Sequence, residues 1–301
     1  MTTLLLTGAT GFLGSHILKG LIEKMNYNVV ILKRSFSNTE RIDQFLSNPR
    51  IKYYDLDKTN LEDIFKQNKI DIIIHTATEY GKNHASNLHV LETNLMFPIK
   101  LVELGIEHGC KSFINTDSFF NKEGLSYSYL LNYSLSKKSL LMWLNYYSKK
   151  INIINIVLEH IYGQNDNPDK FTEYMIRKIA IEQVPEIDLT QGNQERDFVY
   201  IEDIVDAYIK IIAYSLTHDE KLTTFELGTS NPIKLKSFIE KIKELSNSQT
   251  HLNFGALPYR EDEIMFSKAD ISTLSELYWT PKFNIENGLR KIITRYKEES
   301  T

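Results

Sequence analysis

The chain has 301 residues, 42% of them hydrophobic, and a formal net charge of −4. That length supports one large domain, or one and a half, around a substantial core. Its 35 Lys and Arg are dispersed and are matched by 39 Asp and Glu, which excludes a general affinity for nucleic acid or acidic membranes. Cys110 is the one cysteine, which excludes an intrachain disulfide and a metal site built on two cysteines.

The N-terminal stretch predicts no targeting segment. Its apolar run, Thr3-Leu4-Leu5-Leu6-Thr7, is too short for a signal peptide or a membrane span, and no basic region precedes it. We therefore expect a cytoplasmic protein with neither a membrane nor a nucleic-acid partner.

Short apolar runs alternate with longer helical patterns over the first half of the chain. Helices are predicted at 12–24, about 86–108 and about 133–149, between strands at 4–7, 29–32, 51–55, 70–75, 112–115 and 151–158. Strands separated by helices indicate a parallel sheet that is covered on both faces. The right-handed crossover rule then gives an α/β fold with a doubly wound Rossmann sheet.

Beyond residue 158 the pattern changes to loops, short strands and separate helices, one of them near 171–182. We expect residues 1–160, with 197–218 returning to them, to form a dinucleotide-binding domain. Residues 161–196 and 219–301 are expected to form a smaller, substrate-binding lobe over the carboxyl edge of the sheet, where such sheets bind ligands.

Three glycines, Gly8, Gly11 and Gly14, lie between the first predicted strand and the first predicted helix. Glycine permits a tight turn close to a pyrophosphate, and the helix N-terminus adds N–H donors and a partial positive charge. A tight turn without a ligand is the alternative, but a position that opens a βαβ unit favours dinucleotide binding. The expected contact residues are Gly8, Thr10, Gly11, Phe12, Leu13 and Gly14.

The second predicted strand ends in Lys33-Arg34-Ser35. An NAD site usually has an Asp or Glu here, which accepts hydrogen bonds from the ribose hydroxyls, and this chain offers no carboxylate at that point. Lys33, Arg34 and Ser35 can instead hold a 2′-phosphate through charge-assisted hydrogen bonds. The sequence therefore favours NADP(H) and leaves NAD(H) open, with a solvated basic pair as the alternative.

Other positions are also predicted to border the cofactor. Asp55 and Leu56 follow the third strand, where they would approach the adenine amine, and Thr76-Ala77-Thr78 follows the fourth strand. Asn94 lies inside the long helix, and it either pins that helix to the sheet or faces solvent.

Hydride transfer to a ketone needs an acid for the developing alkoxide and a donor that polarises the carbonyl. A Tyr with a Lys four residues later on a helix can serve, because both side chains share one face and the ammonium lowers the phenol pKa. Only Tyr133 and Lys137 open the helix after the fifth strand, beside the cofactor edge. Thr116, just past that strand, would direct its hydroxyl to the same carbonyl. The same spacing also starts at Tyr54, Tyr146, Tyr174 and Tyr278.

These motifs resemble the extended short-chain dehydrogenase/reductases, in their nucleotide-sugar epimerase/dehydratase branch, over nearly the whole chain. The resemblance rests on the run from Thr7 to Gly14, on Thr116, and on Tyr133 with Lys137. Tyr162-Gly163 matches the usual Tyr-Gly after the sixth strand. The segment 194–203 is similar to the branch's sugar-nucleotide segment, and Arg260 resembles its diphosphate-binding arginine.

The resemblance implies a role for each of these residues. Tyr133 is then the acid/base, Lys137 tunes it and binds the nicotinamide ribose, and Thr116 polarises the carbonyl. Arg196 and Arg260 would hold the diphosphate of a CDP-, dTDP- or GDP-linked sugar, since bidentate guanidinium contacts suit phosphates. Without the family, each Arg is read as a surface ion-pair residue. The residues expected to contact the sugar are Thr116, Asp117 and Ser118.

Dehydratases of the branch carry Thr-Asp-Glu after the fifth strand, whereas this chain has Thr-Asp-Ser at 116–118. Water elimination needs an acid and a base beside the hexose, so the missing Glu argues against a dehydratase. Phe119-Phe120 replaces the common aliphatic-Tyr pair, and Glu159-His160 either lines the sugar pocket or is structural. These segments look most like the bacterial 4-ketoreductases of deoxysugar synthesis, a group that includes the CDP-abequose and CDP-paratose synthases.

The resemblance therefore predicts NAD(P)H-dependent reduction of the 4-keto group of a nucleotide-activated deoxyhexose, in the biosynthesis of a surface polysaccharide such as lipopolysaccharide. A C4 epimerase or C4 dehydrogenase with tightly bound NAD(H) is the alternative. A dinucleotide-binding regulator is disfavoured, because such proteins tend to lose the Tyr or the Lys. The family also implies a homodimer through the helices near 86–108 and 133–149, although packing on the sheet explains their apolar positions as well.

Overall fold

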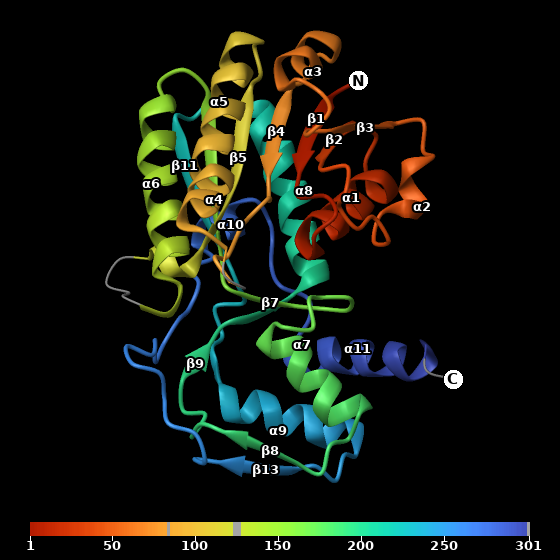
Figure 1. Ribbon diagram of the computed structural model, residues 1–301, viewed down its shortest axis with the longest axis vertical. Helices are drawn as coiled ribbons and strands as arrows, with labels where there is room; N and C mark the ends of the chain where they lie inside the picture. Colours follow the sequence, from red (N-terminus) through yellow and green to blue (C-terminus); the bar gives the residue numbers. More distant parts are fainter. Residues whose placement is uncertain (83–84, 123–127, 300–301) are drawn as a thin grey trace. The chain divides into compact units, whose positions relative to one another are not determined.

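The computed structural model describes residues 1–82, 85–122 and 128–299, and the chain forms two compact units (Figure 1). The first unit comprises Met1–Glu123, Leu130–Val157 and Val205–Phe225, and the second comprises Gly124–Tyr129, Leu158–Ile204 and Glu226–Thr301. Residues 197–204, which the sequence analysis assigns to the first domain, belong to the second unit.

A seven-stranded sheet forms the frame of the first unit, with the doubly wound architecture that the sequence predicts. Its strands are β1 (Thr3–Thr7), β2 (Asn28–Lys33), β3 (Ile51–Asp55), β4 (Ile72–His75), β5 (Ser112–Ser118), β6 (Asn152–Leu158) and β11 (Leu222–Leu227). Their order is β11-β6-β5-β4-β1-β2-β3, and β1 runs parallel to both β2 and β4. The chain order reverses between β1 and β4, so the carboxyl ends of these strands form the switch point where such sheets bind ligands.

Two strands of this sheet differ from the prediction. β5 continues to Ser118, three residues beyond its predicted end, so Thr116 lies inside the strand. β11 joins the main sheet, although the sequence analysis assigns its residues to the second lobe. Its buried residues, Thr223, Phe225 and Leu227, alternate with more exposed ones. That pattern indicates a partly covered strand but does not reveal which sheet the strand joins.

Helices cover both faces of the sheet, as Figure 1 shows for α5 and α6 on one face and α8 on the other. They are α1 (Phe12–Lys24), α2 (Asp43–Leu46), α3 (Leu61–Gln67), α4 (Asn87–Leu91), η1 (Glu92–Met96), α5 (Phe97–Glu107), η2 (Phe119–Asn121), η3 (Ser128–Leu130), α6 (Leu131–Tyr147) and α8 (Ile201–Thr217). On one face α3, α5 and α6 share a core through side chains such as Leu61, Leu101 and Leu140. On the other face α1 contacts α8, where a Cβ on Gly20 would lie 2.3 Å from a methyl group of Val205.

The long helix predicted at 86–108 consists of three segments. Between α4 and α5 lies η1, a single π-helical turn that contains the fully buried Asn94. Such turns are often found at functional sites. Pro98 at the start of α5 is tolerated, because its missing N–H falls in the first turn of that helix.

The second unit is built from short strands, helices and a core rich in aromatic side chains. Its elements are β7 (His160–Tyr162), α7 (Phe171–Ile176), η4 (Arg177–Ile181), β8 (Glu186–Leu189), β9 (Glu195–Arg196), β10 (Phe198–Tyr200), β12 (Ile233–Lys234), α9 (Leu235–Ser246), β13 (His251–Phe254), α10 (Ser272–Glu276) and α11 (Ile285–Glu299). Phe198 stacks on Phe238 with ring centroids 4.1 Å apart. A Cβ on Gly288 would lie 2.2 Å from the Tyr162 hydroxyl, so α11 approaches β7 at a glycine. The helix predicted near 171–182 is present as α7 and η4.

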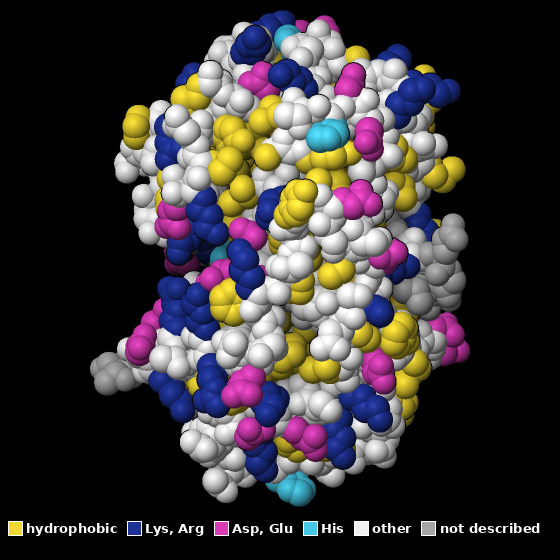
Figure 2. Space-filling model, turned by 180° about the vertical axis from the view of Figure 1, so that it is seen from behind, with side chains coloured by type: hydrophobic (Ala, Val, Ile, Leu, Met, Phe, Trp, Pro, Cys, Tyr) yellow, Lys and Arg dark blue, Asp and Glu magenta, His cyan; other side chains and the backbone are white. Residues whose placement is uncertain are grey.

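Charged side chains of both signs are interspersed on the face that Figure 2 shows. Several of the chain's exposed charges pair within one helix, such as Arg290 with Glu286 and Lys178 with Glu182. Exposed pairs of this kind contribute little to stability. In the part of the chain that the structure describes, no helix is both long enough and apolar enough to cross a membrane.

Candidate functional site

The glycine turn has a backbone geometry that requires glycine. Gly8 adopts a φ of +69°, and its carbonyl accepts a hydrogen bond from the Gly11 N–H at 2.9 Å. A Cβ on Gly14 would lie 2.2 Å from the Gly8 carbonyl oxygen, so a side chain there would push α1 away from the turn. Gly11 is the N-cap of α1 and has no side chain with which to cap the N–H groups of that helix, which suits an anionic ligand.

The segment after β4 packs directly on this turn. The N–H groups of Thr76 and Ala77 donate to the Thr7 hydroxyl, and the Thr76 hydroxyl donates to the Thr7 carbonyl at 2.8 Å. A Cβ on Gly8 would lie 2.6 Å from the Thr76 hydroxyl oxygen. Thr76 and Ala77 therefore form one wall of the glycine turn, and the half-buried Thr78 follows them.

The basic end of β2 differs from the predicted 2′-phosphate site. Lys33 Nζ lies 2.5 Å from Asp55 Oδ1, and Ser35 donates to Asp57 through both its N–H and its hydroxyl. Arg34 is exposed. Two of the three predicted phosphate ligands are therefore already paired within the protein, and Arg34 is the cation of this segment that extends into solvent.

Asp55 and Leu56, the predicted adenine-side residues, are joined to the same end of β2. Asp55 pairs with Lys33, and the Leu56 N–H donates to the Lys33 carbonyl at 2.8 Å. Periodicity treats each strand separately and does not reveal this cross-strand pair. The sequence analysis also misses Arg41, whose Nη1 lies 3.4 Å from the Thr10 carbonyl oxygen of the glycine turn. Arg41 precedes α2 in an irregular segment, where no pattern marks it.

The first half of α6 carries the predicted Tyr and Lys pair. Tyr133 and Lys137 are one turn apart and are only 4% and 2% exposed. Lys137 Nζ donates to the Thr116 carbonyl at 2.8 Å. The Tyr133 ring contacts those of Tyr80 and Phe120, with centroid distances of 5.1 and 6.2 Å. The structure therefore brings Tyr133 and Lys137 to the end of β5.

The hydroxyl beside Tyr133 belongs to Ser118, not to Thr116. Thr116 Oγ1 lies 2.7 Å from the hydroxyl of Tyr208 on α8, and Ser112, four residues earlier in β5, also donates to α8. Side-chain alternation thus directs Thr116 to the face that α8 covers. The Ser118 side chain ends the strand near Tyr133, where it opposes the rise in the pKa of Tyr133. In this structure the Thr116 hydroxyl is used by Tyr208, and its contact with a substrate carbonyl stays a prediction.

Burial sets the protonation of the Tyr and Lys pair. It raises the pKa of Tyr133 well above the usual value, Tyr80 adds to the effect, and the hydrogen bond with Ser118 opposes it. The Tyr-x-x-x-Lys spacing predicts a lowered pKa of Tyr133, whereas in this structure burial of the ring raises it. Burial also lowers the pKa of Lys137 to about 8, against the attraction of Asp117.

Asp117 is turned into the protein and is 3% exposed. Its Oδ1 accepts from the Ser118 N–H at 2.8 Å and from Asn121 Nδ2 at 2.7 Å, while its Oδ2 accepts from Asn155 Nδ2 at 3.1 Å. Burial raises its pKa, and the charge of Lys137 and these hydrogen bonds act against the rise. Three protein donors therefore hold Asp117 inside the protein, and its predicted contact with substrate stays a prediction.

Asn94 pins η1 to its surroundings. Its Oδ1 accepts from the Glu79 N–H at 2.8 Å, and its Nδ2 donates to the Glu79 carbonyl at 2.7 Å and to the Ser136 hydroxyl at 3.0 Å. Ser136 lies between Tyr133 and Lys137 on α6. Asn94 is therefore buried and does not face solvent, and it fastens the long helix to the segment after β4 and to α6, not to a strand of the sheet. Its contact with a cofactor stays a prediction.

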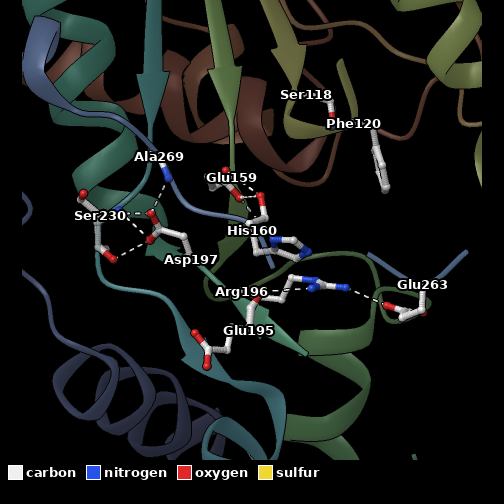
Figure 3. A network of polar contacts seen from close by, with 12 residues as sticks. Ser118, Phe120, Glu159, His160, Glu195, Arg196, Asp197, Ser230, Glu263 and Ala269 are labelled. Carbon is white, nitrogen blue, oxygen red and sulfur yellow. Dashed lines mark hydrogen bonds and ion pairs between the residues drawn. The ribbon is translucent and has the colours of Figure 1, made fainter. Parts of the chain in front are cut away.

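The two predicted diphosphate arginines, Arg196 and Arg260, both belong to the second unit. Arg196 is 6% exposed and donates to Glu263 Oε1 at 2.7 Å (Figure 3). Arg260 begins the turn that ends at Glu263, and its guanidinium lies 3.8 Å from the centre of the Tyr129 ring. One short turn therefore carries Arg260 and supplies the acidic partner of Arg196. Binding of a diphosphate by the two side chains stays a prediction.

Most of the chain matches a known protein family. The family described as "NAD dependent epimerase/dehydratase family" matches residues 4–227, a range that includes the glycine turn, Ser118, Tyr133, Lys137 and Arg196. The chain belongs to this NAD-dependent epimerase/dehydratase family. The family member is 36% identical to the CDP-abequose synthase of Salmonella muenchen and 31% identical to that of Salmonella typhimurium, in each case over 97% of both chains.

Solved structures of 4-epimerases share the fold of this epimerase/dehydratase family member. The UDP-glucose 4-epimerase of Thermotoga maritima matches with a TM-score of 0.85 and 20% identity over 100% of both chains. A UDP-glucuronic acid 4-epimerase of Bacillus cereus, solved with a UDP-sugar and NAD, matches with a TM-score of 0.84 and 23% identity over 99% of this chain and 100% of its own. At these identities the likeness establishes the fold alone.

The acid beside Arg196 is structural in this epimerase/dehydratase family member. Asp197 is 0% exposed, and it accepts from the backbone N–H groups of Thr229, Ser230 and Ala269 at 2.7, 2.8 and 3.0 Å (Figure 3). Four donors in all reach this carboxylate, since the Thr229 hydroxyl also donates to it. Asp197 therefore fastens the loop after β11 and the segment around Ala269 to the start of β10.

Glu159 follows β6 and has a second structural role. Its carboxylate is buried, and both oxygens accept from the Ser267 hydroxyl, at 2.9 and 2.8 Å. His160 Nδ1 lies 3.7 Å from Glu159 Oε2, and burial lowers the pKa of His160 (Figure 3). Of the two roles that the sequence leaves open for Glu159, the structure favours the structural one.

Proposed function

We propose that this family member uses NAD(P)H to reduce the 4-keto group of a nucleotide-activated deoxyhexose, in the biosynthesis of a surface polysaccharide. The observation that carries the proposal is Tyr133, which is buried at the end of β5 near Ser118 and lies one helical turn from Lys137. Reduction of a ketone requires such a proton donor beside a polarising hydroxyl. The CDP-abequose synthases among the relatives support a deoxysugar as substrate.

The glycine turn and its neighbours fit a nicotinamide dinucleotide. Gly8, Gly11 and Gly14 leave a backbone cradle that any Cβ would obstruct, and the N-terminus of α1 opens onto it. This turn would hold the diphosphate, Thr76–Thr78 would border the cofactor, and Lys137 would bind the nicotinamide ribose. When bound, the cofactor supplies a hydride to carbon 4 of the sugar.

Of the three residues from which the sequence favours NADP(H), Lys33, Arg34 and Ser35, only Arg34 is not already paired with an Asp. Lys33 and Ser35 are paired with Asp55 and Asp57, so they cannot both bind a 2′-phosphate without breaking these pairs. Arg34 and Arg41 take their place in the proposal. Arg34 is exposed at the end of β2, Arg41 reaches the glycine turn, and guanidinium groups bind phosphate well.

In the proposed reaction Tyr133 is the acid. Because burial raises its pKa, the phenol keeps its proton at neutral pH and can pass it to the ketone oxygen as negative charge develops there. The Ser118 hydroxyl would donate to the same oxygen and polarise the carbonyl. The O–H bond of Tyr133 breaks as an O–H bond forms on the sugar and a C–H bond forms at carbon 4. The ketone is reduced to an alcohol, the cofactor is oxidised, and the Lys137 ammonium stabilises the phenolate left behind.

The second unit is proposed to supply the nucleotide-binding arginines. Arg196 and Arg260 already contact Glu263 and Tyr129, and a diphosphate would offer them charge-assisted, bidentate hydrogen bonds. Among CDP-, dTDP- and GDP-linked sugars, the names of the relatives favour a CDP-linked one.

A C4 epimerase or C4 dehydrogenase that retains NAD(H) is the second candidate, because 4-epimerases have this fold. Such an enzyme first uses the Tyr as a base on an intact sugar alcohol. Both reactions use the same Tyr and Lys pair, so the CDP-abequose synthases among the relatives, at 36% and 31% identity, are what favours the reductase. The cofactor retained by the purified protein distinguishes the two: tightly held NAD(H) supports the epimerase or dehydrogenase, and free exchange of NADPH supports the reductase.

The test is oxidation of NADPH or NADH by the purified protein with CDP-, dTDP- and GDP-linked 4-keto-deoxyhexoses. Tyr133→Phe is expected to lower the turnover number by about 10²- to 10⁴-fold, the usual contribution of a general acid. Tyr146→Phe is the matched control, since Tyr146 begins another Tyr-x-x-x-Lys match on α6 but is 56% exposed, and it should retain activity. Lack of cofactor oxidation with every sugar, or full activity of Tyr133→Phe, would contradict the proposal.

A further inference from the structure

Asp117 is a buried acid at the candidate site that the proposed reaction does not use. It lies one residue from the Thr116 carbonyl that binds Lys137 and one residue from the hydroxyl of Ser118. Its three hydrogen-bond donors come from Ser118, from Asn121 in η2 and from Asn155 in β6. All three are N–H groups, so the carboxylate accepts at both oxygens, as an ionised group does.

The contacts of Asp117 close the turn that presents Ser118. The Ser118 N–H and the Asn121 side chain converge on the same oxygen, Oδ1, while the Ser118 hydroxyl accepts from the Phe120 N–H at 3.4 Å. Residues 117–121 therefore form a closed turn at the end of β5. The orientation of the Ser118 hydroxyl toward Tyr133 depends on this turn.

Asp117 also supplies the negative charge opposite Lys137. Other groups near this ammonium are the Thr116 carbonyl of β5, which accepts its hydrogen bond, and His75 of β4, while Tyr133 lies one turn earlier on the same helix. Burial and the charge of Lys137 lower the pKa of His75 well below its usual value, so His75 stays neutral near pH 7. Burial raises the pKa of Tyr133, so this phenol is neutral as well.

We propose that Asp117 is a positioning residue, whose carboxylate fixes the turn that presents Ser118 and keeps Lys137 charged, and that it is not an acid that acts on the sugar. The proposal rests on the proposed function for the role of Ser118 and Lys137. The two roles of Asp117 can be separated by substitution. The turn needs only a hydrogen-bond acceptor at Oδ1, whereas Lys137 needs a negative charge opposite it.

Asp117→Asn separates these two parts. An Asn keeps Oδ1 for Ser118 and Asn121 but removes the charge. Its new Nδ2 meets Asn155, whose Oδ1 now accepts from Asn115 Nδ2 at 2.7 Å. The Asn115 Oδ1 is buried and has no hydrogen-bond partner in the structure. Rotation of the Asn155 and Asn115 amides reverses this chain of hydrogen bonds and replaces the unpartnered Asn115 oxygen with an unpartnered amide nitrogen. These three side chains then keep the same number of unpartnered atoms, so the variant is expected to fold.

The expected result is a shift in the pH dependence of turnover. Activity of the wild type should fall as pH rises through the pKa of Lys137, at about 8. Without the opposing carboxylate that pKa falls, so in Asp117→Asn the decline should move down by about one pH unit. Lowering the pH to 6 should restore most of the activity. The matched control, Ser118→Ala, removes the hydroxyl that the turn presents but leaves Asp117 and its three N–H donors in place, and should lower turnover at all pH values without moving the decline.

A measurement without substrate separates this inference from the proposed function. The folded protein holds the Lys137 proton more weakly than the unfolded chain, whose lysine pKa is near 10.5. The free energy of unfolding should therefore rise with pH from about pH 8, and Lys137→Met should abolish that rise. In Asp117→Asn the rise in unfolding free energy should begin at lower pH. The Asp117→Asn/Lys137→Met double variant is its reference, because that variant lacks the contribution of Lys137.

The outcomes are distinct. If the wild type shows no turnover but the rise in unfolding free energy still begins at lower pH in Asp117→Asn, the inference is supported and the proposed function is contradicted. Coincident unfolding curves for the wild type and Asp117→Asn would overturn the inference. Loss of turnover in Asp117→Asn at every pH, with the unfolding shift present, would make Asp117 an acid in the reaction and would also overturn it. If Asp117→Asn does not fold, Asn155→Ala removes the donor to Oδ2 and should move the decline in the same direction by less.

Discussion

At Asp197 one carboxylate connects three segments of the second unit, and four donors converge on it. In Asp197→Ala these donors lose their acceptor inside the protein, and each buried unpaired donor costs about 1–3 kcal/mol. Some of the donors can recover water, so we expect the free energy of unfolding to fall by about 3–5 kcal/mol. Urea unfolding measures this loss.

Asp219 offers the control, because its side chain is exposed. Asp219→Ala should change the free energy of unfolding by about 0.5 kcal/mol or less. A wild-type midpoint for Asp197→Ala would mean that the carboxylate does not hold these segments. Asp197 lies within the segment that resembles a sugar-nucleotide site, so a loss of stability would separate its role in folding from the proposed role of its neighbour Arg196.

At the scale of elements, η1 joins the segment after β4 to α6, the helix that carries Tyr133 and Lys137. Asn94 makes this connection through the backbone of Glu79 and the hydroxyl of Ser136. Asn94→Ala leaves the Glu79 N–H and carbonyl without this partner, and we expect it to cost about 2–4 kcal/mol of unfolding free energy. Turnover should also fall, because Tyr133 and Lys137 flank Ser136. Asn145→Ala on the exposed side of α6 is the matched control and should leave both quantities near wild type.

The elements also indicate what a single sequence can predict. The helix predicted at 12–24 matches α1, because its apolar side chains repeat at helical spacing and a glycine turn marks its start. The π turn in the middle of the predicted helix 86–108 has no such signal, since it depends on a bond between Asn94 and a distant loop. The sequence also does not reveal that the hydroxyl near Tyr133 is that of Ser118 and not that of Thr116, and this has a related cause. The spacing places a hydroxyl near Tyr133, but the end of β5 and the cover of α8 decide which hydroxyl it is.

For the molecule as a whole, the exposed apolar side chains of the first unit favour self-association. Leu135, Met142 and Tyr146 on α6 are 54%, 75% and 56% exposed, and spacings of seven and four place them on one face of the helix. Met96 on the neighbouring η1 is 59% exposed. A contiguous apolar face on a folded chain usually marks an interaction site. We therefore predict a homodimer through this face, as the family resemblance implies.

Met142→Glu tests that dimer, because it places a charge without a partner at the most exposed position of the face. Burying such a charge costs several kcal/mol, so the dissociation constant should rise by at least about 100-fold. Native mass spectrometry and light scattering would then report a monomer, while Tyr278→Glu, a control at a tyrosine that is 91% exposed, should remain dimeric. A monomeric wild type, or a dimeric Met142→Glu, would contradict the prediction. Every residue assigned to the reaction belongs to one chain, so the Met142→Glu monomer should keep its turnover number per chain.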